Sequence, residues 1–181
     1  FSQLAMGTFD DVNAISKIAV NTHLAGAAGT VTGAALTRLI GGKTDIVMML
    51  NGALAGLVAI TAEPLTPGPI TAMIIGSIGA VIMYYGTKLL ENFGLDDVVG
   101  AIPVHMFAGI FGTLVVPLTN ADTSFGTQLI GVISVCIFSF VLSWITFSTL
   151  KSTVGLRISR AAEKLGTDKA EVGVIAYSIR D

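Results

Sequence analysis

Five long apolar stretches, separated by short polar breaks, dominate the first 150 residues of the chain. Each stretch reaches the roughly 17–25 residues that an α-helix needs to cross the hydrocarbon core of a bilayer. The first two are interrupted by small polar residues, and the others are nearly continuous. We therefore predict five membrane-spanning helices, over residues 12–39, 46–62, 70–90, 98–118 and 126–150.

The breaks between these stretches carry turn-forming residues. They read IGGKTD, AEPLTPGP, ENFGLDD and TNADTS, and three of the five prolines lie in the second one, where no helix can continue. After residue 150 the sequence becomes polar. The expected architecture is an all-α, polytopic transmembrane bundle over residues 1–150, followed by a C-terminal tail over residues 151–181.

The composition supports a membrane protein. Charged residues make up 12% of the chain and apolar residues 52%, whereas soluble domains carry about 25% charged residues. A water-soluble fold of 181 residues would need more charge to cover its surface. These values argue against a soluble enzyme, a nucleic-acid binder and a disordered chain, so no nucleic-acid partner is expected.

The basic residues alternate between the breaks and predict an orientation. Arg38 and Lys43 lie at the first break and Lys88 at the third, six of the ten Lys and Arg follow residue 150, and the second and fourth breaks have none. Cytoplasmic connections of membrane proteins are enriched in Lys and Arg. We therefore expect a multi-pass protein of the cytoplasmic membrane, with its N-terminal end outside and its tail in the cytoplasm. Lys17 is an exception, close enough to the outer interface to snorkel.

Small residues recur at helical spacing in the apolar stretches. Gly29 and Gly33 form one small-xxx-small pattern, and Gly52 and Gly56 form another. In lipid such patterns let helix backbones approach closely. They predict a tightly packed bundle, as in a polytopic transporter.

Two histidines lie inside the apolar stretches. His105 follows Asp97 by eight residues, about 12 Å along a helix axis, which places it near the membrane midplane. A neutral imidazole there offers one donor and one acceptor to a small polar molecule. The alternative is a core histidine bonded to a neighbouring carbonyl, and the residues leave both open. His23 is expected to be a packed histidine bonded to a neighbouring helix.

Three further polar residues have simple structural explanations. Asp97 opens the fourth apolar stretch, and a helix N-terminus stabilises a carboxylate. Asn51 and Thr61 lie ten residues apart, on nearly the same helix face, and are expected to form hydrogen bonds within the bundle.

The sequence shows no pattern for catalysis or for binding a metal or cofactor. Its two histidines and its single cysteine, Cys136, fall in separate predicted helices, without the spacing of a zinc site. The glycine-rich patches lie within predicted helices rather than after strands, as a phosphate-binding loop would require. We expect no enzyme activity, no cofactor and no bound metal.

Three segments together resemble the ammonium transporters of the Amt/Mep/Rh family. They are NGALAGLVAITA at 51–62, DDVVGAIPVHMFAGIFGTL at 96–114, and GLRIS at 155–159 followed by AY in the tail. Their order and spacing are similar to the second half of that fold, which has eleven helices arranged as two inverted repeats. The resemblance implies that the opening FSQLAMG is the end of the preceding helix, and that the other pore histidine and the vestibule aromatic residues precede residue 1.

The resemblance also implies roles for individual residues. His105 matches the second of the family's twin pore histidines, and Asp97 matches an aspartate that supports the pore. Thr61 and Asn51 fall where the family has polar groups beside the pore. Ser2 corresponds to the serine of the outer vestibule, where aromatic rings hold ammonium by cation–π contacts. In the family the cation binds outside, loses its proton and crosses as ammonia.

The same resemblance implies partners. These are ammonium and ammonia as the transported species, membrane lipid, two further copies in a homotrimer, and a PII-type regulator at the cytoplasmic face. The alternative is a membrane ammonium sensor coupled to a cytoplasmic signalling partner. It stays open because the tail reads GTD and EVGV where the family usually has Gly-Leu-Asp and Glu-His-Gly-Glu.

Overall fold

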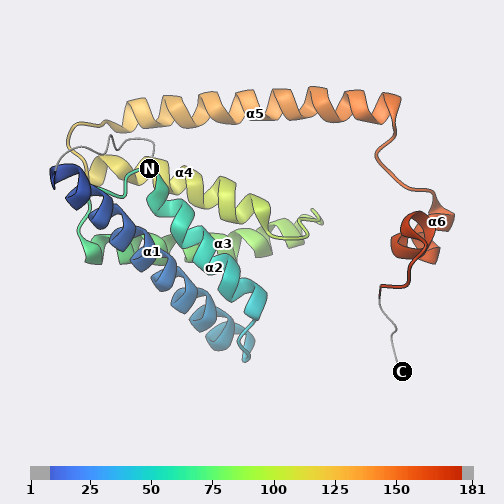
Figure 1. The fold of residues 1–181 in the computed structure, drawn as a ribbon, viewed down its shortest axis with the longest axis horizontal. Helices are drawn as coiled ribbons and strands as arrows, with labels where there is room; N and C mark the ends of the chain where they lie inside the picture. The colour runs from blue at the N-terminus through green and yellow to red at the C-terminus, as the bar shows by residue number, and fades with distance from the viewer. Residues whose placement is uncertain (1–8, 177–181) are drawn as a thin grey trace. The chain divides into compact units, whose positions relative to one another are not determined.

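The fold, obtained as a computed structural model, is described for residues 9–176, and the regular secondary structure in that range consists of helices joined by loops. The chain divides into two compact units, residues 1–132 and 133–181. In the N-terminal unit three long helices pack against one another and against a fourth, segmented helix (Figure 1). These elements are α1 (Phe9–Gly41), α2 (Ile46–Thr61), α3 (Pro69–Asn92), and the consecutive η1 (Ile102–Phe107), α4 (Ala108–Val115) and η2 (Val116–Leu118).

The C-terminal unit contains the later part of α5 (Phe125–Thr153), which begins in the N-terminal unit, and a tail with more structure than its polar sequence predicts. In the tail, α6 (Arg160–Leu165) is capped by Ser159, whose hydroxyl accepts a hydrogen bond from the Ala162 amide at 3.2 Å. A π-helical turn, η3 (Asp168–Val172), follows it.

Local signals explain where two of the helices begin. The Asp45 carboxylate caps α2 by accepting a hydrogen bond from the Met48 amide at 3.0 Å. Pro69 opens α3, at a position where its missing N–H group would have no helical partner. By length and composition, α3 and α5 can each cross a membrane, while α2 and the segment Ile102–Leu118 are shorter apolar helices. The count of five spans stays a prediction.

The fourth helix was predicted to begin at residue 98, and this prediction was wrong, because the helix begins later. Its first turn is η1, which starts at Ile102, because Gly100 has a φ of +72°. That left-handed conformation interrupts a right-handed helix. Val98 and Val99 extend the apolar run in the sequence, but they lie outside the helix with 86% and 67% of their surface exposed.

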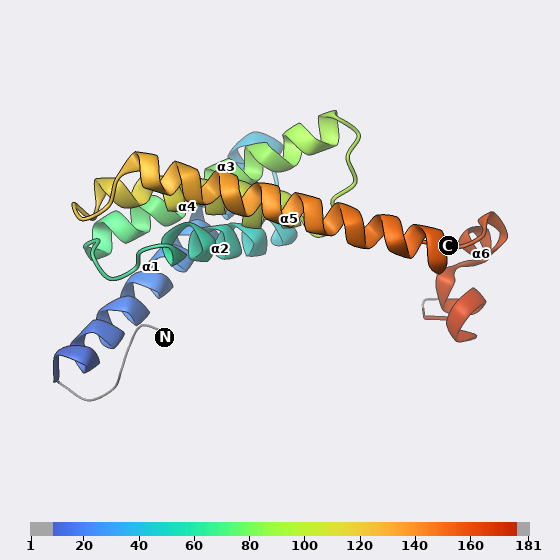
Figure 2. The same ribbon diagram turned by 90° about the horizontal axis from the view of Figure 1, so that it is seen from above.

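The first three helices approach through glycine, as the small-residue spacing predicted. A Cβ atom added to Gly29 of α1 would overlap the carbonyl oxygen of Gly52 in α2, and one added to Gly52 would lie 2.6 Å from the carbonyl oxygen of Gly29. A Cβ atom added to Gly76 of α3 would meet the carbonyl of Ala25 in α1. Backbone therefore touches backbone at these seams, which lie where α1, α2 and α3 converge (Figures 1 and 2).

Two small clusters of buried side chains form the core of the N-terminal unit. The first joins α1, α2 and α3, with two side chains of α4 packed against it, and the second joins α2, α3 and the start of the fourth helix. The first cluster consists of Ala25, Ala59, Ile60, Ala72 and Ile75, covered by Phe111 and Val115. The second consists of Ala55, Met83, Val104 and Ala108, covered by Met48 and Val58.

Candidate functional site

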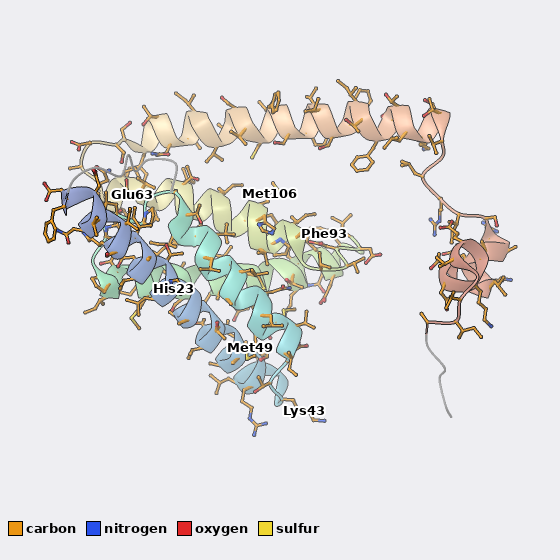
Figure 3. The ribbon with its side chains drawn as sticks, viewed as in Figure 1. His23, Lys43, Met49, Glu63, Phe93 and Met106 are labelled. Atoms are coloured by element: carbon orange, nitrogen blue, oxygen red, sulfur yellow. The ribbon has the colours of Figure 1, made fainter. Side chains whose placement is uncertain are left out.

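His105 lies in η1, the π-helical turn that opens the fourth helix. On that turn Pro103 and Val104 are buried, and Val104 belongs to the second core cluster. His105 and Met106 are exposed in this chain, and Met106 marks the place of the turn in Figure 3. The turn thus anchors one side in the bundle and presents the imidazole on the other. Single π-helical turns occur frequently at functional sites.

Asp97 caps the helix that carries His105. Its two carboxylate oxygens accept hydrogen bonds from the backbone amides of Ala101, at 2.9 Å, and Ile102, at 2.7 Å. These amides belong to the first turn of a helix, where N–H groups have no partner within the helix. The carboxylate therefore fixes the start of η1, in agreement with the expected N-terminal role.

Asn51 holds the same segment from α2. Its side-chain amide donates a hydrogen bond to the carbonyl oxygen of Val99 at 3.1 Å. A Cβ atom on Gly100 would lie 2.8 Å from that amide nitrogen, so a side chain at residue 100 would displace the Asn51 amide, in addition to the strain from the positive φ. Asn51 and Asp97 thus converge on the residues that lead into η1 and determine where His105 lies.

Replacing Asp97 with Ala should destabilise the protein by about 0.5–2 kcal/mol, the usual cost of losing a helix N-cap. Asp96→Ala is the matched control, because Asp96 is exposed and its side chain makes no hydrogen bond within the described residues. The apparent melting temperatures of the two variants in detergent measure the difference. Equal losses at both positions would contradict the assignment of the cap to Asp97.

The other candidate residues do not join this group. Thr61 lies at the opposite end of α2, and its hydroxyl donates to the carbonyl oxygen of Leu57 in the same helix at 2.6 Å. The ring of His23 is exposed and bonds through Nδ1 to the carbonyl oxygen of Ala19 at 2.7 Å. The prediction of a bond from His23 to a neighbouring helix was therefore wrong, because its own helix supplies the acceptor. Ser2 lies outside the described residues.

A second polar cluster lies at the end of the bundle where α2 ends, and the sequence interpretation missed it. Asn21 of α1 is fully buried, and its amide nitrogen donates to the carbonyl oxygens of Pro64 at 2.8 Å and Pro67 at 2.9 Å. Glu63, labelled in Figure 3, accepts a hydrogen bond from the side-chain amide of Asn120 at 3.1 Å. A polar residue within an otherwise apolar run was the available signal for Asn21.

A cavity of about 200 Å³ lies beside the start of η1. The residues that line it include the acidic residues Glu91, Asp96 and Asp97, together with Thr87 and Pro103. Among residues 9–176 no group of three or more His, Cys, Asp or Glu side chains is arranged to hold a metal ion.

Comparisons with known proteins agree on one family. The model of the Ammonium Transporter Family matches residues 5–177. The ammonium transporter Amt2 of Archaeoglobus fulgidus is 42% identical over 184 residues, covering 90% of this chain and 39% of that protein. The chain therefore spans about two fifths of the length of this relative.

Solved structures show the same likeness in three dimensions. The structure of a sensor Amt protein matches with a TM-score of 0.81 and 30% identity, covering 87% of this chain and 42% of that one. The crystal structure of Mep2 from Candida albicans matches with a TM-score of 0.74 and 27% identity, over 87% of this chain and 39% of that one. The helical arrangement of the N-terminal unit is thus shared with proteins of this kind.

Proposed function

Because the chain belongs to the ammonium transporter family, we propose that the intact protein moves ammonium or ammonia across a membrane. The observation that carries this proposal is the family match over residues 5–177. The matched range includes η1 and the residues that hold η1 in place. The chain spans about two fifths of the relative from Archaeoglobus fulgidus, so the proposed path also involves segments outside it.

The exposed imidazole supports a role for His105 in that path. Asp97 and Asn51 fix the segment before η1 through three hydrogen bonds, and the buried Pro103 and Val104 fix the turn itself. The ring of His105 makes no hydrogen bond within residues 9–176. We propose that it faces the path and offers its donor and acceptor to the passing molecule.

We propose that the molecule that passes His105 is neutral ammonia. Moving an unpaired cation from water into an apolar environment costs far more free energy than moving a small neutral molecule that keeps a hydrogen bond. The residues around His105 on η1 are Val104, Met106 and Phe107, none of which carries a charge. A single imidazole in such surroundings suits a neutral cargo.

The topology and partners are part of the same proposal. The end of the bundle that contains Arg38, Lys43 and Lys88 faces the cytoplasm together with the tail, and the end that contains Glu63 and Asn120 faces outside. The protein forms a homotrimer surrounded by membrane lipid. Its cytoplasmic face is where a PII-type regulator would dock, and Thr61 belongs to the path.

Ammonium-evoked current across proteoliposomes that contain the intact protein tests the proposed function. We expect a current that saturates with ammonium concentration and is absent from liposomes without protein. Saturable ammonium binding without any current would contradict transport and favour an ammonium sensor. Absence of both binding and current would contradict the proposal as a whole.

A further inference from the structure

Glu63 is placed to connect two helices at the end of the bundle where α2 ends. It lies two residues beyond Thr61, the last residue of α2, while Asn120 lies two residues beyond Leu118, the last residue of η2. The hydrogen bond from the Asn120 side chain to the Glu63 carboxylate, 3.1 Å long, therefore joins the ends of α2 and of the fourth helix. The two residues are 57 positions apart in the sequence.

Both partners of this bond are fixed by their own connections. The other carboxylate oxygen of Glu63 accepts hydrogen bonds from the amides of Leu65 at 3.1 Å and Thr66 at 3.2 Å. The side-chain oxygen of Asn120 accepts a hydrogen bond from the amide of Asp122 at 3.0 Å. Each side chain thus stabilises the turn in its own interhelical connection and also bonds to the side chain from the other connection.

Asn21 ties the first of these connections to α1. Its amide nitrogen bonds the carbonyl oxygens of Pro64 and Pro67, which flank the turn that Glu63 organises. A fully buried amide with two such bonds restricts movement of the connection relative to α1. The Glu63–Asn120 bond therefore links the fourth helix to a connection that is also bonded to α1.

The two helices pack closely beneath this bond. A Cβ atom added to Gly112 of α4 would meet the carbonyl oxygen of Ala59 in α2. Phe111 and Val115 of α4 cover the core cluster that contains Ala59 and Ile60. Close packing fixes the middle of the contact, and the Glu63–Asn120 bond fixes its end.

We propose that Glu63 is a positioning residue for transport, acting through Asn120 to hold the end of α2 at a fixed distance from the fourth helix. The inference rests on the proposed function, because α2 and η1 carry the residues assigned to the path. Glu63 itself need not touch the transported molecule. What it sets is the spacing between the helix that carries Thr61 and the helix that carries His105.

A charge-conserving swap tests this inference. In Glu63→Gln the side chain has one oxygen left, so either Asn120 or the amides of Leu65 and Thr66 lose their acceptor. In Asn120→Asp two carboxylates face each other within hydrogen-bond distance. The double variant Glu63→Gln/Asn120→Asp restores every bond, since the new amide donates to the new carboxylate and the net charge of the pair is again −1.

Saturating rate, half-saturating ammonium concentration and melting temperature are measured for the four intact proteins in proteoliposomes and detergent. We expect each single variant to lower the saturating rate by about two- to tenfold, the range that corresponds to one hydrogen bond. The double variant should return to within about twofold of the wild type. Recovery in the double variant is the result that a purely destabilising substitution would not give.

Two results would overturn the inference while leaving the proposed function intact. One is four equal rates, even if the melting temperatures differ. The other is opposite shifts of the half-saturating concentration, upward in Glu63→Gln and downward in Asn120→Asp, because attraction of the cation by charge alone predicts that pattern. A wild-type protein without transport would overturn the proposed function and this inference with it.

Discussion

Gly29→Ala should lower the free energy of unfolding by about 1–3 kcal/mol, the usual cost of overpacking a tight contact. The added methyl group would overlap the carbonyl oxygen of Gly52, which belongs to the backbone of α2 and has no flexible side chain to move aside. The two helices must therefore separate along the seam. The gain of up to about 1 kcal/mol in helix propensity opposes this loss but is smaller.

Gly131→Ala is the matched control for this substitution. Gly131 also lies within a helix, α5, but a Cβ atom there would meet nothing within 4 Å. We expect its melting temperature to stay the same or rise slightly, whereas that of Gly29→Ala falls. The measurement is the apparent melting temperature of the intact protein in detergent. Similar melting temperatures for the two variants would mean that the seam between α1 and α2 tolerates separation.

His105→Ala should change the transport rate of the intact protein by about two- to tenfold, or change which species passes, without preventing insertion into the membrane. The substitution removes the imidazole donor and acceptor that we assign to the path, and one hydrogen bond is worth about 0.5–1.5 kcal/mol. The backbone of η1 stays in place, because Asp97, Asn51 and the buried Pro103 hold it independently of the imidazole.

Met106→Ala serves as the control for His105→Ala. Met106 is the next residue on the same turn and is 48% exposed, but it has no strong hydrogen-bonding group. Ammonium-evoked currents in proteoliposomes should therefore change more in His105→Ala than in Met106→Ala. If the current of His105→Ala matches that of the wild type in size and selectivity, His105 is a structural residue and its assignment to the path is wrong.

Much of the fold could be read from the sequence because hydropathy and turn residues are local properties. The predicted range 46–62 differs from α2 (Ile46–Thr61) by one residue, since Asp45 caps its start and the proline-rich connection follows its end. The glycine seam was also predicted, because small residues four apart share a face of a helix. The same local reasoning assigned a helix-terminal role to Asp97.

The other features of the fold and the site could not be predicted from the sequence, because they depend on contacts between distant segments. The partners of Asn21 lie 43 and 46 residues away, and the partner of Asn51 lies 48 residues away. No pattern in the sequence brings these groups together. The start of the fourth helix was misplaced because hydropathy registers the apolar Val98 and Val99 but not the backbone conformation of Gly100.

The wide turn at η1 has a consequence for how this helix changes in evolution. An α-helix turns by about 100° per residue, so the gain or loss of one residue normally rotates everything beyond it. A π-helical turn holds one residue more than an α-helical turn. Deleting one residue between Ile102 and Phe107 would therefore convert it into an α-helical turn, without rotating the segments on either side about the helix axis. Gly112 would keep its place against Ala59, and Asp97 would still cap the start. One-residue insertions and deletions among relatives are therefore expected at this turn before any other part of the fourth helix.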